Sequence, residues 1–301
     1  MLENYLKWPE LFEEAKGIEV PEVRGERVVY TGMGGSYIPG KVAEILDFPV
    51  DYASVPGIPR RVDEKTVVIA VSYSGTTGET IEAVKMALKK GSKVIVITSG
   101  GNLEKLAREN NVPVVKVKGL SQTRYSFPVL FTPVLKLLSY LSGAKLNLDL
   151  LKEGIVQGKE RMMKLAEELV TSINGVIPVF YASKYFPIAI RFKQEVNENA
   201  KYPAFYGEIP EVNHNEIESY ASGKYLLPVV IGNEDLDKVT SQVLNARQIQ
   251  PTFSDVLMNI SSLMFLAGVM SIKLAERMGV NPEKLSIIPK ARSLTSNLFK
   301  L

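Results

Sequence analysis

The sequence predicts an α/β protein built from two tandem domains, each a parallel sheet flanked by helices. Short apolar runs typical of buried strands alternate with segments of helical period along the first half. Turns of small residues follow several of these runs, as is common where a strand of a parallel sheet leads into a helix. The second half repeats the order of strand, small-residue turn and helix more loosely. We therefore expect a first domain over residues 1–150 and a second over residues 151–301.

The first half has the clearer pattern of elements. Residues 2–15 have the apolar rhythm of an amphipathic helix. The elements that we expect after it are strands at 27–31, 50–53, 66–71, 93–98 and 114–117 and helices at 38–46, 79–90, 103–110 and 126–141. Strands separated by helices pair in parallel, and ligands of such sheets bind at the carboxyl ends of the strands.

The second half opens with a polar helix at residues 150–173, which we expect to lead into the second domain. The elements expected after it are strands at 176–182 and 229–231 and helices at 185–199, 236–247 and 255–278. The most apolar stretch, residues 256–272, contains four polar residues and is slightly short for a membrane span. We interpret it as a buried helix and expect no membrane partner.

Composition excludes several classes of protein. The 301 residues are 46% hydrophobic and 23% charged, as in a globular protein, and a net charge of +3 is too small to indicate a nucleic-acid partner. The acidic N-terminus lacks the apolar core of a signal peptide, and cysteine is absent, so we expect a cytoplasmic location. With His214 as the single histidine, a zinc site is not expected, although composition leaves a carboxylate site for Mg²⁺ open.

The segment 70–80, A-V-S-Y-S-G-T-T-G-E-T, carries the strongest functional signal. It joins an expected strand to an expected helix, whose first N–H groups and dipole favour an anion. Hydroxyl groups add donors, and Gly75 lets a phosphate approach the backbone. An ordinary loop with helix-capping hydroxyls is the alternative, but the density of hydroxyls favours a site for a phosphorylated small molecule.

A second turn, Gly32-Met33-Gly34-Gly35-Ser36, also follows an expected strand. The two loops lie at the same edge of the predicted sheet, so they can face one ligand. Neither is a Walker A loop or a G-x-G-x-x-G fingerprint. The sequence therefore predicts a phosphate site of another kind.

Candidate acid–base groups lie in the second half. Glu195 and Glu198 end an expected helix, and His214 follows in a polar segment. A carboxylate and an imidazole beside a sugar phosphate suit proton transfer. By spacing alone, however, the two glutamates are more often a solvated helix face, and a lone histidine is more often structural.

Four motifs favour the catalytic interpretation because they occur together. They are Gly32-Met33-Gly34-Gly35-Ser36, Ser72-Tyr73-Ser74-Gly75-x-Thr77, Asn197-Glu198-x-Ala200-Lys201 and Pro210-Glu211-x-Asn213-His214-Asn215-Glu216. In this combination the chain resembles, over nearly its whole length, the mainly archaeal bifunctional phosphoglucose/phosphomannose isomerase family, whose members carry two sugar-isomerase (SIS) domains. The serine motif alone is shared by many SIS proteins, whereas the Glu198 and His214 motifs are narrower.

The resemblance implies roles for particular residues. Glu198 would be the base that moves a proton between C1 and C2 of the open-chain sugar, and His214 would open the sugar ring. Arg124 would stabilise the enediolate. A C-terminal basic residue is expected as well, either Lys290 or its rival Arg292, although Pro289 breaks the pattern of a leucine-lysine pair in a terminal helix that is usual in the family. The substrate phosphate would be bound by Gly34, Gly35, Ser36, Ser72, Ser74 and Thr77.

The resemblance also implies a reaction. It would be an aldose–ketose isomerisation of glucose 6-phosphate and mannose 6-phosphate to fructose 6-phosphate, a step of glycolysis and gluconeogenesis. No metal and no cofactor are expected, and the partner is a small sugar phosphate. A homodimer is expected, in which His214 could come from the neighbouring subunit. Two alternatives stay open, namely another SIS enzyme that acts on amino-sugar phosphates and a non-catalytic regulator that binds a sugar phosphate.

Overall fold

The computed structural model describes residues 1–221, 223 and 225–299, which form two compact units. We call residues 10–148 with 285–301 the serine-loop unit, and residues 1–9 with 149–284 the Glu198 unit. Each unit thus combines a central stretch of chain with one chain terminus. The domain division expected from the sequence, at residue 150, differs from these units in the assignment of the terminal segments.

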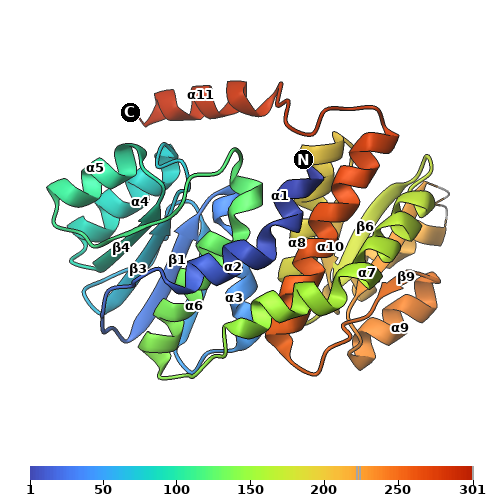
Figure 1. The fold of residues 1–301 in the computed structure, drawn as a ribbon, viewed down its shortest axis with the longest axis horizontal. Helices are drawn as coiled ribbons and strands as arrows, with labels where there is room; N and C mark the ends of the chain where they lie inside the picture. Colours follow the sequence, from blue (N-terminus) through green and yellow to red (C-terminus); the bar gives the residue numbers. More distant parts are fainter. Residues whose placement is uncertain (222, 224, 300–301) are drawn as a thin grey trace. The chain divides into compact units, whose positions relative to one another are not determined.

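The serine-loop unit contains a five-stranded sheet in the order β2-β1-β3-β4-β5 (Figure 1). All of its strand pairs are parallel. The strands are β1 (Arg27–Gly32), β2 (Asp51–Pro56), β3 (Thr66–Val71), β4 (Lys93–Thr98) and β5 (Val114–Lys116). The helices are α2 (Trp8–Lys16), whose first two residues belong to the Glu198 unit, α3 (Ile38–Ala43), α4 (Gly78–Lys89), α5 (Gly101–Glu109), α6 (Phe127–Ser142) and α11 (Ile288–Leu298). Every residue of β3 is buried, because helices cover a parallel sheet on both faces.

The core on one face of this sheet is made by α4 and α5. Val68, Ala70, Val94 and Val96 of β3 and β4 form one cluster with apolar residues of the two helices, Ile81, Val84, Ala87, Leu103 and Ala107. Alternate strand residues point to one face, so the pattern in β3 places every second side chain in this cluster. The packing fixes the strand-to-helix turns at the carboxyl edge of the sheet.

The Glu198 unit contains a four-stranded parallel sheet in the order β7-β6-β8-β9. Its strands are β6 (Ile177–Ala182), β7 (Phe205–Glu208), β8 (Leu226–Ile231) and β9 (Arg247–Ile249), and its helices are α1 (Leu2–Leu6), α7 (Asp149–Ser172), α8 (Phe186–Glu195), α9 (Asp235–Leu244) and α10 (Val256–Arg277). The strand order repeats that of β2-β1-β3-β4 in the other unit. This confirms the predicted fold class of two related parallel-sheet domains.

Helix α10 forms the centre of the Glu198 unit. Among the described residues it is the one helix with the length and hydropathy to cross a membrane, but 89% of its apolar window is buried in the protein. It packs closely on α7 because a Cβ on Gly154 would lie 2.4 Å from the carbonyl oxygen of Met258. The helix is therefore a core helix, as predicted.

The first residues of the chain belong to this same core. The ring of Tyr5, on α1, packs on the backbone of α10, where a Cβ on Gly268 would lie 2.1 Å from the ring. Trp8 is fully buried, and its ring centroid lies 5.3 Å from that of Tyr5. Chain-terminal segments are usually poorly ordered unless they are tied down in this way.

Candidate active site

The serine loop, residues 72–77, connects β3 to α4, whose N-cap residue is Thr77. Ser72 donates its hydroxyl to Oγ1 of Thr77 at 3.0 Å, and the N–H of Gly75 donates to the carbonyl of Ser72 at 3.0 Å. The hydroxyls of Ser74 and Thr76 lie 2.9 Å apart, and both residues are exposed. Hydroxyl donors therefore gather at the positive end of a helix dipole, which is an arrangement suited to an anion.

Gly75 is required by the backbone of this loop. Its φ of +66° is in the left-handed region, and a Cβ there would lie 1.7 Å from the carbonyl oxygen of Gly100. The N–H of Leu103, at the start of α5, donates to the carbonyl of Gly75 at 2.8 Å. The loops that follow β3 and β4 are thus in direct backbone contact.

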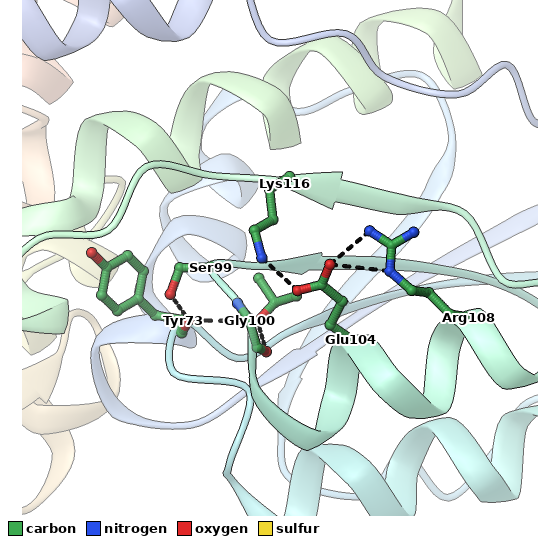
Figure 2. Close-up of polar contacts among 7 residues, drawn as sticks. Tyr73, Ser99, Gly100, Glu104, Arg108 and Lys116 are labelled. Atoms are coloured by element: carbon green, nitrogen blue, oxygen red, sulfur yellow. Dashed lines mark hydrogen bonds and ion pairs between the residues drawn. The ribbon is translucent and has the colours of Figure 1, made fainter.

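Figure 2 shows a second link between these loops, through Tyr73 and Ser99. The carbonyl of Tyr73 accepts from the N–H of Ser99 at 3.0 Å and from its hydroxyl at 2.6 Å. Farther along α5, Glu104 forms an ion pair with Lys116 of β5 (Figure 2). Glu104 forms a second ion pair with Arg108, with a distance of 2.7 Å between nitrogen and oxygen. The hydrogen bonds from Lys116 and Arg108 lower the pKa of Glu104. These contacts hold the β4 and β5 ends beside the serine loop.

The glycine turn lies at the same edge of the sheet. Gly34, Gly35 and Ser36 form one 3₁₀ turn after β1, and Ser36 is buried. The hydroxyl oxygen of Ser36 accepts from the N–H of Tyr73 at 3.0 Å. The predicted phosphate residues from both loops are therefore joined within one unit.

Arg124 is brought to this edge as well. It lies in a 3₁₀ turn, Thr123–Ser126, and a Cβ on Gly35 would lie 2.9 Å from Cγ2 of Thr123. Arg124 is buried, and its guanidinium carbon lies 5.3 Å from the ring centroid of Tyr125. The glycine turn thus packs against the segment that carries the predicted oxyanion-stabilising residue.

Sequence reasoning missed the part that Tyr73 plays. Its hydroxyl donates to the carbonyls of Lys118 and Leu120, each at 3.2 Å. Burial raises the pKa of Tyr73. The side chain therefore anchors the segment that leads to Arg124, and an aromatic residue between two loop serines was the signal that could have indicated it.

Glu198 lies on a π-helical turn, Val196–Ala200, that continues α8, and the residue is half-buried. Lys201 closes the turn with a φ of +54°, and its ammonium group donates to the carbonyl of Glu198 at 2.5 Å and to that of Pro282 at 2.9 Å. Single π turns inside or at the end of α-helices occur frequently at functional sites. The Asn197-Glu198-x-Ala200-Lys201 motif thus encodes an irregular backbone that presents one carboxylate.

His214 ends a 3₁₀ turn, Glu211–His214, in the same unit and is exposed. Its neighbours fix the segment, because Asn213 accepts from the hydroxyl of Thr240 at 3.0 Å and Asn215 donates to Glu211 at 2.8 Å. The imidazole is therefore presented on a tethered turn.

The segment after His214 is tied to the central strand β6. Tyr181, at the end of β6, donates to Glu216 at 2.6 Å, and its hydroxyl oxygen lies 3.1 Å from that of Tyr220. Burial and the hydrogen bond to Glu216 raise the pKa of Tyr181, and burial raises the pKa of Tyr220 to about 12. Both phenols are therefore neutral hydrogen-bond donors near neutral pH.

The Glu198 unit has no counterpart of the serine loop at its own strand-to-helix junction among the described residues. There the buried carboxylate of Asp237 accepts from the N–H of Ser183 at 2.9 Å and from that of Glu234 at 3.1 Å. A Cβ on Gly232 would lie 2.0 Å from this carboxylate, and burial raises the pKa of Asp237. An internal carboxylate thus takes up the backbone donors of this junction.

Lys290 and Arg292 lie on α11 (Ile288–Leu298) and are exposed. Pro289, which departs from the leucine-lysine pattern of the family, does not prevent a helix here. Pro289 lies in the first turn of α11, where its missing N–H breaks no helical hydrogen bond and its fixed φ suits the helix.

The predicted residues thus divide between the units. The phosphate loops, Arg124, Lys290 and Arg292 belong to the serine-loop unit, whereas Glu198 and His214 belong to the Glu198 unit. Within the described residues, no group of three or more His, Asp or Glu side chains is arranged to hold a metal ion.

Residues 24–115 match the SIS domain family, and residues 162–294 match the C-terminal SIS domain of bacterial phospho-glucose isomerase. A D-glucosamine-6-phosphate 4-epimerase from Sulfolobus acidocaldarius is 43% identical over 98% of both chains. The chain belongs to the SIS-domain sugar isomerase family. This confirms the resemblance on which the sequence analysis relied.

Two further comparisons bear on the family and the fold. A bifunctional phosphoglucose/phosphomannose isomerase from Thermoplasma volcanium is 32% identical over 89% of this chain and 90% of its own length. The crystal structure of a putative phosphosugar isomerase from Clostridium difficile superposes with a TM-score of 0.77, covering 93% of this chain and 94% of that one at 14% identity. The last likeness is one of fold alone.

Proposed function

We propose that the chain is a phosphosugar isomerase or epimerase in which the serine loop binds the phosphate of a hexose or hexosamine 6-phosphate and Glu198 is the base. The observation that carries the proposal is the presence of two sites in one chain: a hydroxyl-rich strand-to-helix loop at a helix N-terminus, and a half-buried carboxylate on a π turn. Binding the phosphate away from the reacting carbons would hold the sugar near the base.

The favoured reaction is the 4-epimerisation of D-glucosamine 6-phosphate. Support comes from the 43% identity over 98% of both chains to the Sulfolobus enzyme, which exceeds the 32% identity to the bifunctional isomerase of Thermoplasma. The motifs alone favour the bifunctional isomerase, with an enzyme of amino-sugar phosphates or a non-catalytic regulator as the alternatives. The higher identity to the Sulfolobus enzyme supports placing an amino-sugar enzyme first.

Proton transfer between C1 and C2 would serve both reactions. In an aldose the hydrogen on C4 has no neighbouring carbonyl, so a base alone does not epimerise C4. After Glu198 has moved the C2 proton to C1, the imine at C2 accepts the electrons of the C3–C4 bond as that bond breaks. The C4 hydroxyl loses its proton and becomes an aldehyde, which rotates and is attacked again by C3 from its other face. Returning the proton from C1 to C2 completes the epimerisation without an oxidant.

The second candidate is the interconversion of glucose 6-phosphate and mannose 6-phosphate with fructose 6-phosphate. The identity of about a third to several bifunctional isomerases favours it. It needs only the first proton transfer, with Arg124 stabilising the enediolate and His214 opening the ring. The proposal in either form includes no metal or cofactor, a cytoplasmic homodimer and a sugar phosphate as the only partner.

One substrate panel separates the candidates. The purified protein is incubated in D₂O with glucosamine, glucose, mannose or fructose 6-phosphate, and the products are identified by NMR. Formation of galactosamine 6-phosphate with deuterium at C2 supports epimerisation, whereas formation of fructose 6-phosphate from the two aldoses supports the second candidate. Release of ammonia would indicate a deaminase, and binding without turnover would indicate a regulator.

The base assignment is tested with Glu198→Gln against Glu160→Gln, which replaces an exposed glutamate on α7. We expect the first variant to lose roughly 10²–10⁴-fold in kcat and the second to keep its rate. Near-normal turnover by Glu198→Gln would show that another group is the base. Mixed dimers of Glu198→Gln and His214→Ala subunits would regain activity if the two residues act on one sugar from different subunits.

A further inference from the structure

Beneath the π turn of the Glu198 unit lies a fully buried polar cluster. Along α8 and its π extension, Arg191, Glu195 and Asn199 are spaced four residues apart, which places them on one face. All three are buried, whereas Glu198 is only half-buried. The turn that carries the predicted base is therefore attached to the core by polar side chains on its inner face.

The contacts in the cluster converge on one carboxylate. Glu195 forms an ion pair with Arg191 through Oε1. Its Oε2 accepts from the hydroxyl of Tyr5 at 2.7 Å and from Nδ2 of Asn199 at 2.7 Å. The amide nitrogen of Asn199 also lies 3.1 Å from the Tyr5 hydroxyl and 2.8 Å from Oγ of Ser271. A buried charge with several donors of this kind is costly to disrupt.

Both Ser271 and Tyr5, which contact the amide of Asn199, are held in place by the core helix α10. Ser271 lies on α10 and donates its hydroxyl to the carbonyl of Gly268 at 2.7 Å. Gly268 is also the residue on which the ring of Tyr5 packs. The amide of Asn199, one residue after Glu198, is thus held between the rigid core helix and the first helix of the chain.

A plain core would not require this chemistry, because apolar side chains of similar volume usually stabilise as well as a buried ion pair. The cluster does something that apolar contacts do not, since directional bonds fix where the turn begins and where Asn199 lies. A π turn has weaker intrinsic preference than an α-helical turn and needs such support.

We propose that Tyr5, Arg191, Glu195, Asn199 and Ser271 are positioning residues that hold the Glu198 carboxylate in its productive place. This inference rests on the proposed function, in which Glu198 is the base. A displacement of a catalytic group by about 1 Å can reduce a rate by roughly 10²-fold. The cluster therefore acts on kcat, because it sets the location of the base, whereas the residues proposed to bind the phosphate belong to the serine-loop unit.

Helix α10 offers a matched pair of variants. Ser271 and Ser262 are both buried, and each donates its hydroxyl to the carbonyl three residues earlier, at 2.7 Å and 3.1 Å. Only Ser271 also accepts from Asn199. We expect Ser271→Ala to lower kcat by roughly tenfold or more with KM within about twofold, and Ser262→Ala to leave both constants within about twofold. The two variants should melt at similar temperatures.

The assay uses the full-length protein and the sugar phosphate that the substrate panel shows to be converted. Deuterium incorporation at C2 from D₂O is measured in parallel and should fall by the same factor as kcat, because it reports the proton transfer itself. A loss in Ser262→Ala equal to that in Ser271→Ala would overturn the positioning role, as would unchanged kcat in both. Should Ser271→Ala not fold, Tyr5→Phe is judged by the same criterion.

Two failures can be told apart. If Glu198→Gln keeps its rate, the proposed base is wrong, whatever Ser271→Ala does. If Glu198→Gln is inactive while Ser271→Ala matches Ser262→Ala, the base assignment stands and the positioning role alone is wrong.

Discussion

The carbonyl oxygen of Gly100 occupies the space that a side chain on Gly75 would need, with only 1.7 Å between that oxygen and the Cβ position. Gly75 belongs to the serine loop, and Gly100 precedes α5. The shape of the proposed phosphate site therefore depends on a backbone-to-backbone contact between two loops.

Gly75→Ala should destabilise the protein by more than the backbone strain that alanine causes at a left-handed glycine position. Gly143 is the matched control, because its φ of +72° is similar but no atom lies within 4 Å of its Cβ position. Gly143→Ala should cost about 1–2 kcal/mol of unfolding free energy from backbone strain. Gly75→Ala should cost more and should raise KM for the sugar phosphate. Denaturant unfolding and steady-state kinetics check both, and equal costs with an unchanged KM would contradict the role given to this contact.

Tyr5→Phe should destabilise the protein in a pH-dependent way. The variant removes a buried hydrogen bond to a carboxylate, which is worth about 1.5–3 kcal/mol. Burial and the Glu195 charge raise the pKa of Tyr5, so the folded protein keeps this proton where the unfolded chain loses it. The stability advantage of the wild type is therefore fully present below about pH 10 and shrinks as the pH rises further. Urea unfolding at pH 7 and above pH 10 measures this, and a difference independent of pH would argue against it.

His214→Ala should affect ring opening selectively. We expect kcat on a cyclic substrate to fall by roughly 10²-fold or more, because an acid–base group is removed. The kcat on a 5-deoxy sugar phosphate, which cannot close the same ring, should fall much less. The exposed Glu218 provides a control, since Glu218→Ala should change neither rate. Equal losses on both substrates would assign His214 another role.

Lys290 and Arg292 should not be equally important. Residues two apart on a helix point roughly 200° from each other, so only one of them faces a given site. We expect Lys290→Ala to reduce kcat by about 10²-fold and Arg292→Ala to change it by less than about twofold, in line with losses seen for single charge-stabilising groups. Both residues are exposed, so melting temperatures should stay constant. The reverse result would identify Arg292 as the functional residue.

Much of the fold could be predicted from local sequence. The strand at 66–71 was predicted with the bounds that the structure gives, because six consecutive apolar or β-branched residues between turns indicate a buried parallel strand. The short strands β7 and β9 were not predicted. Their burial depends on which neighbour they pair with, and segments of three or four residues carry too little periodicity to show it.

The candidate site was accessible from sequence to an uneven degree. The serine loop could be predicted as an anion site from local chemistry, since a dense run of hydroxyls at a helix start favours binding of an anion over simple helix capping. The π turn at Glu198 could not be recognised, because the sequence there continues the helical rhythm of α8 and the irregularity is stabilised by distant residues, Tyr5 and Ser271. The packing of α1 on α10 could not be predicted for the same reason. The apolar rhythm of the first residues indicates that they pack against the core, but it does not indicate which element they contact.

Trp8 makes the packing of the N-terminal residues accessible to fluorescence measurements. It is the single tryptophan of the sequence, it is fully buried, and it belongs with the Glu198 unit although the chain continues directly into the other one. Intrinsic fluorescence therefore reports, without any label, whether the opening turns of the polypeptide are seated. Protein made from a gene cut near residue 148 would carry this optical probe on the half to which it does not belong.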